Sequence, residues 1–384
     1  TLSPLGSSRP TEAGGPEEGG GLREALPLPG AAELRKGRRY LGMAAELWSR
    51  VSSGDLVLMV LVLVHGFVRS VPAVVSTISA GAVGLKELTC MMKNCRDPVI
   101  RCLLDPQCRA ALNCLEKCQL QDQVCSYRCI VSHECETFEA FSLCVLQKHG
   151  CVGAAATRPE LPDPAPMTAF RGAPLTHEAA ESIFIGSLRT EGIDGFGEGN
   201  DALLDDASLR DWSWKVAAGQ NPAYDFFPSQ HQLFYRAKRG MTMWYDPTFQ
   251  VDTLYGERVY RRRHYRVRRG PTPGTFFLSV LDNGVTSSEF WRIVDCADDF
   301  SWAVFFYSGA AAAAGQAYTG ALVASRDGEW PQGGGEEAQR RIVAALGKCD
   351  IQKWELFLVD NSNPGDAPLG PWDDYVARER AKAA

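Results

Sequence analysis

The 384-residue chain lacks a long hydrophobic run. Its clearest apolar stretch, LVLMVLVLVHGF at Leu56–Phe67, falls short of the roughly 18 residues that a membrane-spanning helix needs. The chain also lacks a basic excess, since 40 Lys and Arg stand against 46 Asp and Glu, for a net charge of -6. This mild acidity argues against nucleic acid as the main partner. The length suits one or two domains with a hydrophobic core, plus appendages.

Cysteine is scarce in most of the chain and concentrated in one segment. Eleven of the 13 cysteines lie between Cys90 and Cys151, and only Cys296 and Cys349 lie outside it. The segment has no C-x-x-C pair, the spacing that zinc sites and thioredoxin-like sites generally use, and the lone histidines form no ligand set with it. We therefore predict disulfide bonds in an oxidising compartment, rather than a metal site or reduced thiols.

The spacing of these cysteines predicts short helices joined by disulfides. Cys114 and Cys118 are four residues apart, as are Cys125 and Cys129, so each pair shares one helix face. Two such helices folded antiparallel would form nested bridges, Cys114–Cys129 outside and Cys118–Cys125 inside. Spacing alone does not fix the connectivity of so many cysteines. Four further pairings are expected, with Cys135 left over: Cys90–Cys108, Cys95–Cys102, Cys144–Cys151 and Cys296–Cys349.

The order of segments predicts a targeting region before the cysteine-rich domain. A basic cluster (RKGRRY), the apolar stretch Leu56–Phe67 and a small-residue site at Ala80 and Ala82 follow one another. This order is typical of a transfer signal, and an amphipathic or buried helix is the alternative. We expect a targeting or disordered region at 1–82, a disulfide-stapled helical domain at 83–152 and a Pro/Ala-rich linker at 153–205.

From about Trp212 the chain changes to short runs rich in aromatic and β-branched residues. Eight such runs, from WSWKVAAG to YTGALVASRD, are separated by Gly, Pro, Asp and Asn. Their spacing predicts an antiparallel barrel or sandwich over 206–362. Within it, GGEEAQRRIVAALGKC predicts a helix with Ile342, Val343 and Leu346 on one face. Residues 363–384 are expected to be a flexible tail.

One strand of this β region is strongly basic. ERVYRRRHYRVRRG (Glu257–Gly270) contains seven arginines. With a period of two, an outward face is expected to carry Tyr260, Arg262, His264, Arg266 and Arg268. Such a face suits contact with anionic lipid or an acidic partner, or simply a solvated strand protected from edge pairing.

Three stretches resemble the violaxanthin de-epoxidases of chloroplasts. CMMKNC…CLLDPQC…CLEKC resembles the cysteine-rich module of that family, WKVAAGQNPAYDFFPSQ (Trp214–Gln230) resembles its first barrel strand and loop, and FFYSG…AYTGALVASR resembles its later strands. The likeness covers roughly residues 88–362 and is closest to the de-epoxidase-related branch. It implies a mainly β fold, an eight-stranded antiparallel lipocalin-like barrel with a C-terminal helix, preceded by a small disulfide-rich helical domain.

The resemblance also implies an activity. Members of the family convert violaxanthin to antheraxanthin and zeaxanthin in the thylakoid lumen, with ascorbate as co-substrate, for photoprotection. It implies a homodimer and contact with thylakoid lipid on acidification. The alternative is a non-catalytic lipocalin that binds a carotenoid or another isoprenoid. No metal and no nucleic acid are expected.

Epoxide opening sets the chemistry that the site needs. A carboxylic acid kept neutral in an apolar pocket can donate a proton to the epoxide oxygen. By resemblance, Asp225 or Glu289 is the proton donor and Tyr318 orients it. Without the resemblance, Asp225 suits a turn, Glu289 a solvent-facing position and Tyr318 barrel packing. Residues expected to contact the substrate are Trp214, Asn221, Tyr224 and Phe226.

The loop after Asp225 departs from the family pattern. The enzymes have a second acid, a cysteine and a pair of histidines there, whereas this chain has Pro228, Ser229 and a displaced His231. His231 is expected to face the other side of its strand, because strand faces alternate. These changes favour the binding protein, while Asp225 and Tyr318 favour the enzyme.

Overall fold

The computed structural model describes residues 84–119, 121–186, 214–236, 243–333, 335–363, 365–370 and 372–383. The predicted transfer signal lies outside these residues. None of the described helices has the length and apolar character needed to cross a membrane.

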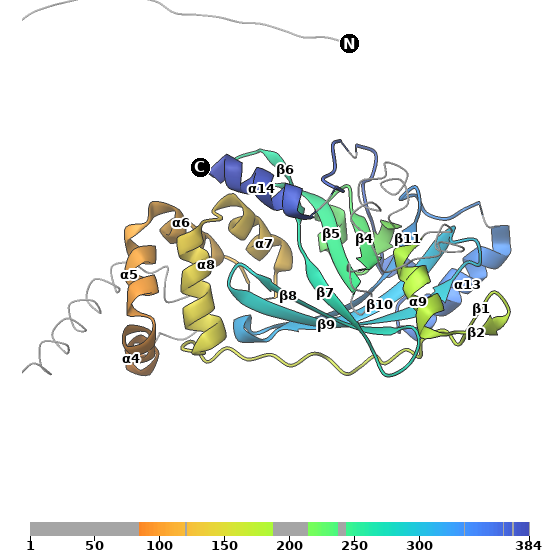
Figure 1. Ribbon diagram of the computed structural model, residues 1–384, viewed down its shortest axis with the longest axis horizontal. Coiled ribbons are helices and arrows are strands. Elements are labelled where there is room, and N and C mark those ends of the chain that lie inside the picture. Colours follow the sequence, from red (N-terminus) through yellow and green to blue (C-terminus); the bar gives the residue numbers. More distant parts are fainter. Residues whose placement is uncertain are drawn as a thin grey trace, which may run out of the picture. The chain divides into compact units, whose positions relative to one another are not determined.

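Short helices form the first part of the described chain (Figure 1): α4 (Leu85–Asn94), α5 (Arg96–Leu104), α6 (Pro106–Leu115), α7 (Gln123–Ser132), α8 (Glu136–Ser142) and the π-helical turn η1 (Leu143–Lys148). Local sequence signals begin two of them. The Asp105 carboxylate accepts hydrogen bonds from backbone N–H groups of α6, and Asp122 does the same for α7. The helices are too short to be stable alone, so tertiary packing and disulfides must hold them.

Five disulfides join these helices: Cys90–Cys151, Cys95–Cys144, Cys102–Cys108, Cys114–Cys129 and Cys118–Cys125. The nested pair between α6 and α7 is confirmed, and Cys135 is free as predicted. The pairings Cys90–Cys108, Cys95–Cys102 and Cys144–Cys151 are wrong. Helix α4 carries Cys90 and ends just before Cys95, and it contacts η1, so these two cysteines meet Cys151 and Cys144 instead.

The predicted Cys296–Cys349 bridge is also wrong, because both cysteines are free and buried. Cys296 packs in the core inside the barrel, whereas Cys349 packs in a separate core beneath the late helix. The two sulfur atoms therefore belong to opposite faces of the sheet.

The β region forms one closed sheet. Its strands are β3 (Trp214–Gly219), β4 (His231–Arg236), β5 (Met243–Asp252), β6 (Arg258–Arg262), β7 (Tyr265–Arg269), β8 (Thr275–Asp282), β9 (Val285–Cys296), β10 (Trp302–Ala311) and β11 (Gln316–Ser325). β6 and β7 pair with successive parts of β5, so together they occupy one strand position. β11 pairs back with β3 and closes the barrel. The predicted eight-stranded antiparallel barrel is confirmed.

Short elements complete the described chain: β1 (Ala169–Phe170), β2 (Ala173–Pro174), α9 (His177–Ile185), α12 (Ala223–Phe226), η3 (Ala312–Ala314), α13 (Gly335–Lys348), η4 (Lys353–Glu355), β12 (Phe357–Leu358) and α14 (Trp372–Ala383). Helix α9 inserts Phe184 into the barrel, where its ring contacts Phe276 and Phe305. The indole Nε1 of Trp214 donates to the Ile183 carbonyl at 2.8 Å. This end of the barrel is therefore filled by aromatic packing.

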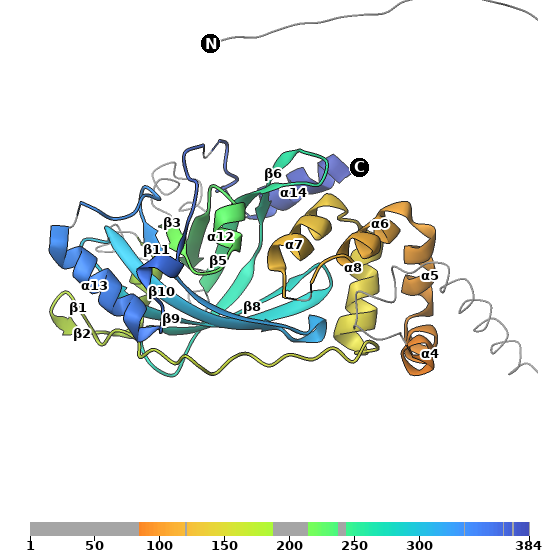
Figure 2. The same ribbon diagram turned by 180° about the vertical axis from the view of Figure 1, so that it is seen from behind.

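The predicted late helix is α13, which lies across the outer face of β9 and β10 (Figure 2). Ile342 and Leu346 are fully buried against that face. Val343, expected on the same side, is 47% exposed, which corrects that part of the prediction.

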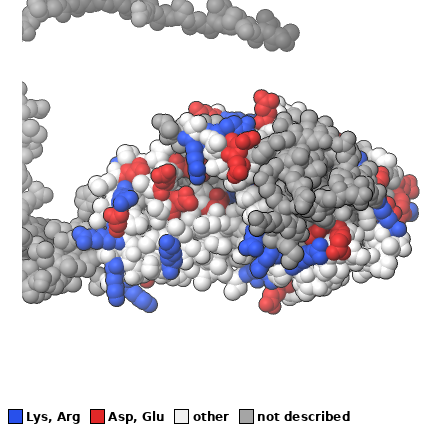
Figure 3. All heavy atoms as spheres, in the orientation of Figure 1, with Lys and Arg blue, Asp and Glu red and all other residues white. Residues whose placement is uncertain are grey.

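Arg262 faces away from the cavity of the barrel, as the period of two predicts, but it is not solvated: its fully buried side chain pairs with Asp246 and donates to the carbonyls of Pro368 and Gly370 in the C-terminal segment. His264 binds the same carboxylate at 2.7 Å and stacks between Trp244 and Trp372. Trp372 begins α14, within the segment expected to be a flexible tail. Basic and acidic side chains are interspersed on the face shown in Figure 3.

Candidate ligand-binding cavity

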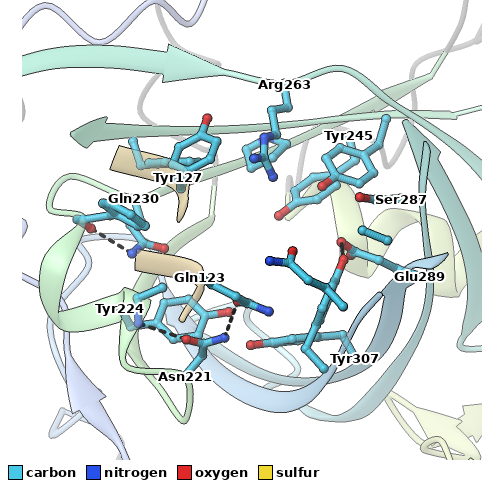
Figure 4. A pocket seen from close by; sticks show the side chains of 18 of the residues that line it. Gln123, Tyr127, Asn221, Tyr224, Gln230, Tyr245, Arg263, Ser287, Glu289 and Tyr307 are labelled. Atoms are coloured by element: carbon cyan, nitrogen blue, oxygen red, sulfur yellow. Dashed lines mark hydrogen bonds between the residues drawn. The ribbon is translucent and has the colours of Figure 1, made fainter. Parts of the chain in front are cut away.

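The end of the barrel that α9 does not fill contains a cavity of about 240 Å³ (Figure 4). Its walls come from the barrel strands, while α7 and α12 contribute its cover. The polar and aromatic side chains that line it include Gln123, Tyr127, Asn221, Tyr224, Gln230, Gln232, Tyr245, Arg263, Tyr265, Ser287, Glu289, Trp291, Tyr307 and Tyr318. Among the described residues lining this cavity, Glu289 is the one carboxylic acid.

Strand register brings Glu289 and Tyr318 together. Glu289 on β9 lies opposite Gly309 on β10, and Gly309 lies opposite Tyr318 on β11. A Cβ on Gly309 would lie 2.5 Å from the Tyr318 ring and 2.9 Å from Glu289 Cγ. Because glycine has no side chain, the Tyr318 ring crosses β10, and its hydroxyl donates to Glu289 Oε1 at 2.7 Å.

The other carboxyl oxygen of Glu289 is also occupied. Trp291 Nε1 donates to Oε2 at 2.6 Å, so two neutral donors hold the group in place. Burial raises the pKa of Glu289 above its ordinary value, and the hydrogen bonds from Trp291 and Tyr318 act in the opposite direction. A buried acid with a raised pKa is suited to donate a proton to a bound ligand.

Tyrosines surround this acid. Burial raises the pKa of Tyr245 and Tyr318 well above the ordinary value, so both remain neutral hydrogen-bond donors. The one arginine in the wall is Arg263, which pairs with Asp282 at 2.8 Å and lies 4.2 Å over the Tyr127 ring. The cavity is therefore lined by aromatic side chains and by about as many polar ones, and ligand sites commonly combine the two kinds.

The structure brings four of the seven predicted site residues to this cavity: Glu289, Tyr318, Asn221 and Tyr224. Asp225 and Phe226 are exposed on α12 and do not line it. Trp214 lies in the filled end of the barrel.

The loop after Asp225 contributes amides to the cavity. Gln230 and Gln232 line it, whereas His231, which lies between them, does not. The alternation predicted for this strand is therefore observed. His231 is buried elsewhere, and burial lowers its pKa to about 4, so it is neutral at neutral pH.

Sequence reasoning missed Gln123 and Tyr127, which reach the cavity from α7 in the disulfide-rich domain. It also missed Tyr245, Trp291 and Tyr307. The alternation of aromatic residues within the strand runs is a signal that could have indicated these three. Nothing local to α7 indicates that it covers a barrel.

Within the described part of the chain, two groups of side chains have the spacing to hold a metal ion: Cys95, Cys144 and His149, and Cys118, Cys125 and Cys129. All five of these cysteines are in disulfide bonds, and a disulfide sulfur is not the thiolate that binds metals. The cysteines of these groups therefore serve as disulfide cross-links and not as metal ligands.

A closed eight-stranded antiparallel barrel with a cavity at one end defines a lipocalin-type protein. The family description "VDE lipocalin domain" matches residues 87–183 and 198–361, more than half of the chain, so the chain belongs to this family.

The chain also matches chloroplastic enzymes, at low identity and over part of their length. The chain is 25% identical over 232 residues to the chloroplastic violaxanthin de-epoxidase of Arabidopsis thaliana, covering 60% of this chain and 39% of that protein. It is 24% identical over 160 residues to that of Spinacia oleracea, covering 41% and 27% respectively. The chain thus spans less than half the length of these relatives.

Solved structures with a similar barrel include lobster apocrustacyanin A1, at 11% identity, with 45% of this chain and 92% of that chain covered and a TM-score of 0.29. Another is the bovine lipocalin allergen Bos d 2, at 5% identity, with 38% and 89% covered and a TM-score of 0.28. The barrel assignment rests on the strand pairing itself.

Proposed function

We propose that the chain binds an epoxy-carotenoid with one ring in the barrel cavity and removes the epoxide oxygen, with ascorbate as reductant. The observation that carries this proposal is Glu289, the buried acid in the cavity, held by Tyr318 and Trp291. The family membership and the name of the Arabidopsis relative supply the substrate class.

In the proposed reaction, the protonated Glu289 carboxyl donates its proton to the epoxide oxygen as a ring C–O bond breaks. Positive charge develops on a carbon next to the polyene, which spreads it. Ascorbate supplies two electrons and is oxidised to dehydroascorbate. With a second proton, the oxygen leaves as water and a double bond forms. Tyr318 holds the acid toward the ligand, and the amides of Gln230 and Gln232 suit the hydroxyl groups of ascorbate.

The proposed location follows from the relatives and the disulfides. The named relatives are chloroplastic, and five disulfides need an oxidising compartment. We place the protein in the thylakoid lumen, peripheral to the membrane, where it acts in the xanthophyll cycle. Contact with thylakoid lipid and a homodimer are part of this proposal.

The test compares Glu289, which lines the cavity, with Asp225, which does not. Oxidised protein is incubated with violaxanthin, galactolipid and ascorbate at about pH 5, because a raised pKa increases the protonated fraction of the Glu289 carboxyl at acidic pH, and pigments are separated by chromatography. We expect zeaxanthin, and a loss of about 100-fold or more in rate for Glu289→Gln. Asp225→Asn, which removes an exposed carboxylate nearby, should retain the activity. The reverse result would show that Asp225 is the proton donor.

The second candidate is a lipocalin that binds the carotenoid without converting it. It is favoured by the cavity residues after α12, which are the neutral amides Gln230 and Gln232, while His231 lies outside the cavity. Pigment that co-purifies with the protein but stays unchanged in this assay would support this candidate. Failure to bind the pigment would exclude both.

A further inference from the structure

A second hollow adjoins the cavity. This outer groove has a volume of about 1020 Å³ and lies among α6, α7, α12 and the turn after β5. Gln123 and Asn221 line both the outer groove and the cavity. Their side chains are joined, since Asn221 Nδ2 donates to Gln123 Oε1 at 2.7 Å, as the dashed line in Figure 4 shows. This amide pair is therefore the partition between the two hollows.

The side chains of Asn221 and Gln123 differ in how firmly they are held. Asn221 Oδ1 also accepts the backbone N–H of Ala223 at 2.9 Å, which fixes Asn221 at the start of α12. Gln123 lies in the first turn of α7, and its side chain has more rotatable bonds. Rotation of Gln123 would break one neutral hydrogen bond, and Gln123 lines both the cavity and the outer groove.

A ligand larger than the cavity needs space outside it, such as the outer groove. Whole drug-sized ligands occupy pockets of about 300–1,000 Å³. The cavity, at about 240 Å³, is below that range, so a carotenoid ring can enter it but the polyene cannot follow.

The outer groove suits an apolar chain. Its lining includes Val124, Pro222, Phe226 and Leu254, together with the Cys114–Cys129 disulfide. Phe226 is 52% exposed and Leu254 is 48% exposed, although both are large and apolar. Large apolar side chains that gather around a groove mark a binding surface more often than chance exposure.

We infer that the outer groove binds the polyene tail of a ligand whose ring occupies the cavity, and that Gln123 and Asn221 form the gate between ring and tail. The inference rests on the proposed function for the placement of the ring. It assigns Phe226, predicted from the sequence to contact substrate, to the tail rather than to the reacting ring.

The test compares two probes that share one ring. β-Ionone carries the ring with a short tail, and β-apo-8′-carotenal carries it with a long polyene. Binding to the oxidised full chain is followed by quenching of tryptophan fluorescence, since Trp291 lies in the cavity wall. Phe226→Asp and Leu254→Asp should each weaken binding of β-apo-8′-carotenal about tenfold and leave β-ionone binding unchanged. Gln123→Ala should speed the association of β-apo-8′-carotenal.

The chain offers a matched control. Leu281, on β8, is 54% exposed and does not line the outer groove, so Leu281→Asp should leave both affinities unchanged. Equal affinities for β-apo-8′-carotenal in wild type, Phe226→Asp and Leu254→Asp would overturn this inference but leave the proposed function standing. Failure of wild type to bind β-ionone would overturn the placement of the ring, and the inference with it. Circular dichroism checks that each variant is folded, and two groove variants are used in case one is not.

Discussion

At the scale of single residues, burial controls the state of the cavity acid. Water is largely excluded around Glu289, and this favours the neutral carboxyl over the carboxylate. Trp291 and Tyr318 donate to its oxygens and limit the rise in pKa. The group is thus both buried and held in one orientation, which a surface glutamate is not.

This environment predicts a pH-dependent difference in stability between wild type and Glu289→Gln. The folded-state pKa of Glu289 is raised above the ordinary value of 4.5. Below pH 4.5 the carboxyl is neutral in both states, and its contribution to stability is fully present. As pH rises through the raised pKa, that contribution is lost, whereas glutamine stays neutral. Urea unfolding should show the variant gaining stability relative to wild type toward neutral pH.

Asp225→Asn is the control for this measurement, because it replaces an exposed carboxyl group by an amide outside the cavity, and it is measured over the same pH series. A constant difference between wild type and Glu289→Gln across the range would contradict the prediction.

A second prediction concerns Gly309, which separates Glu289 from Tyr318. Gly309→Ala places a Cβ against both side chains, so the Tyr318–Glu289 hydrogen bond cannot keep its geometry. We expect a loss of about 1–3 kcal/mol in the free energy of unfolding, together with weaker β-ionone binding. At Gly347 in α13 an added Cβ meets nothing within 4 Å, so Gly347→Ala should be neutral or stabilising. Similar effects of both substitutions would contradict this role of Gly309.

Residues of the candidate site were only partly predictable. Glu289 and Tyr318 could be chosen because the flanking motifs resemble a known family. Their contact could not be, because it depends on strand register and on Gly309 between them. Asp225 follows an equally good motif, yet its helix turns it to solvent.

At the scale of elements, α7 links the disulfides to the cavity. Cys125 and Cys129 tie α7 to α6 and its following turn, while Gln123 and Tyr127 of the same helix line the cavity. A ten-residue helix is marginal alone, so its position over the barrel depends on these ties.

Comparing two disulfides that close loops of similar length can distinguish the positioning of α7 from a general contribution to stability. Cys118–Cys125 and Cys102–Cys108 join residues 7 and 6 apart, so removing either should cost about 2 kcal/mol of unfolding free energy. Only the Cys118→Ser/Cys125→Ser variant should also weaken β-ionone binding, because, of these two bridges, only Cys118–Cys125 holds α7. Calorimetric unfolding and fluorescence titration measure the two effects. An equal loss of affinity in Cys102→Ser/Cys108→Ser would show that the disulfides act only through overall stability.

Elements with strong local patterns were predictable, and those fixed by long-range contacts were not. The eight aromatic runs correspond to the eight strand positions, and the i, i+4 cysteines gave the bridges between α6 and α7. The bridges of α4 depend on its packing against η1, some 50 residues later. The outward direction of Arg262 follows from the strand period, but its burial does not, because the carbonyls of Pro368 and Gly370 that cover it lie more than 100 residues later in the chain.

At the scale of the whole molecule, the described disulfide-rich helices and the barrel contact each other at several places, of which two bear on the cavity and on the β8–β9 turn. Near the cavity, Arg128 Nε donates to the Asp252 carbonyl at 2.8 Å, beside the Gln123–Asn221 pair. Farther along, the β8–β9 turn packs on α8 and η1, where the Thr286 N–H donates to Gln147 at 2.7 Å. The sequence predicted both domains but gave no signal for either contact, because the partners are more than 90 residues apart.

The β8–β9 turn provides a test of whether this contact stabilises the molecule. Asn283 and Gly284 both have positive φ, as a two-residue hairpin turn requires, and a Cβ on Gly284 would overlap the backbone of Glu139 and Leu143. Gly256 has a similar φ of 81°, but a Cβ there meets nothing within 4 Å. Both Gly→Ala substitutions therefore share the backbone cost, and only Gly284→Ala disturbs the contact between domains.

We expect Gly284→Ala to lower the free energy of unfolding by about 1–3 kcal/mol more than Gly256→Ala. It should also weaken β-ionone binding, because helices pushed away from the β8–β9 turn carry α7 away from the cavity. Urea unfolding and fluorescence titration of the two variants measure these differences. Equal losses of stability with unchanged affinity would mean that the β8–β9 turn does not position the helices over the barrel. The contacts of α7 and the Glu134–Arg261 ion pair would then be the main structural support of the ligand site.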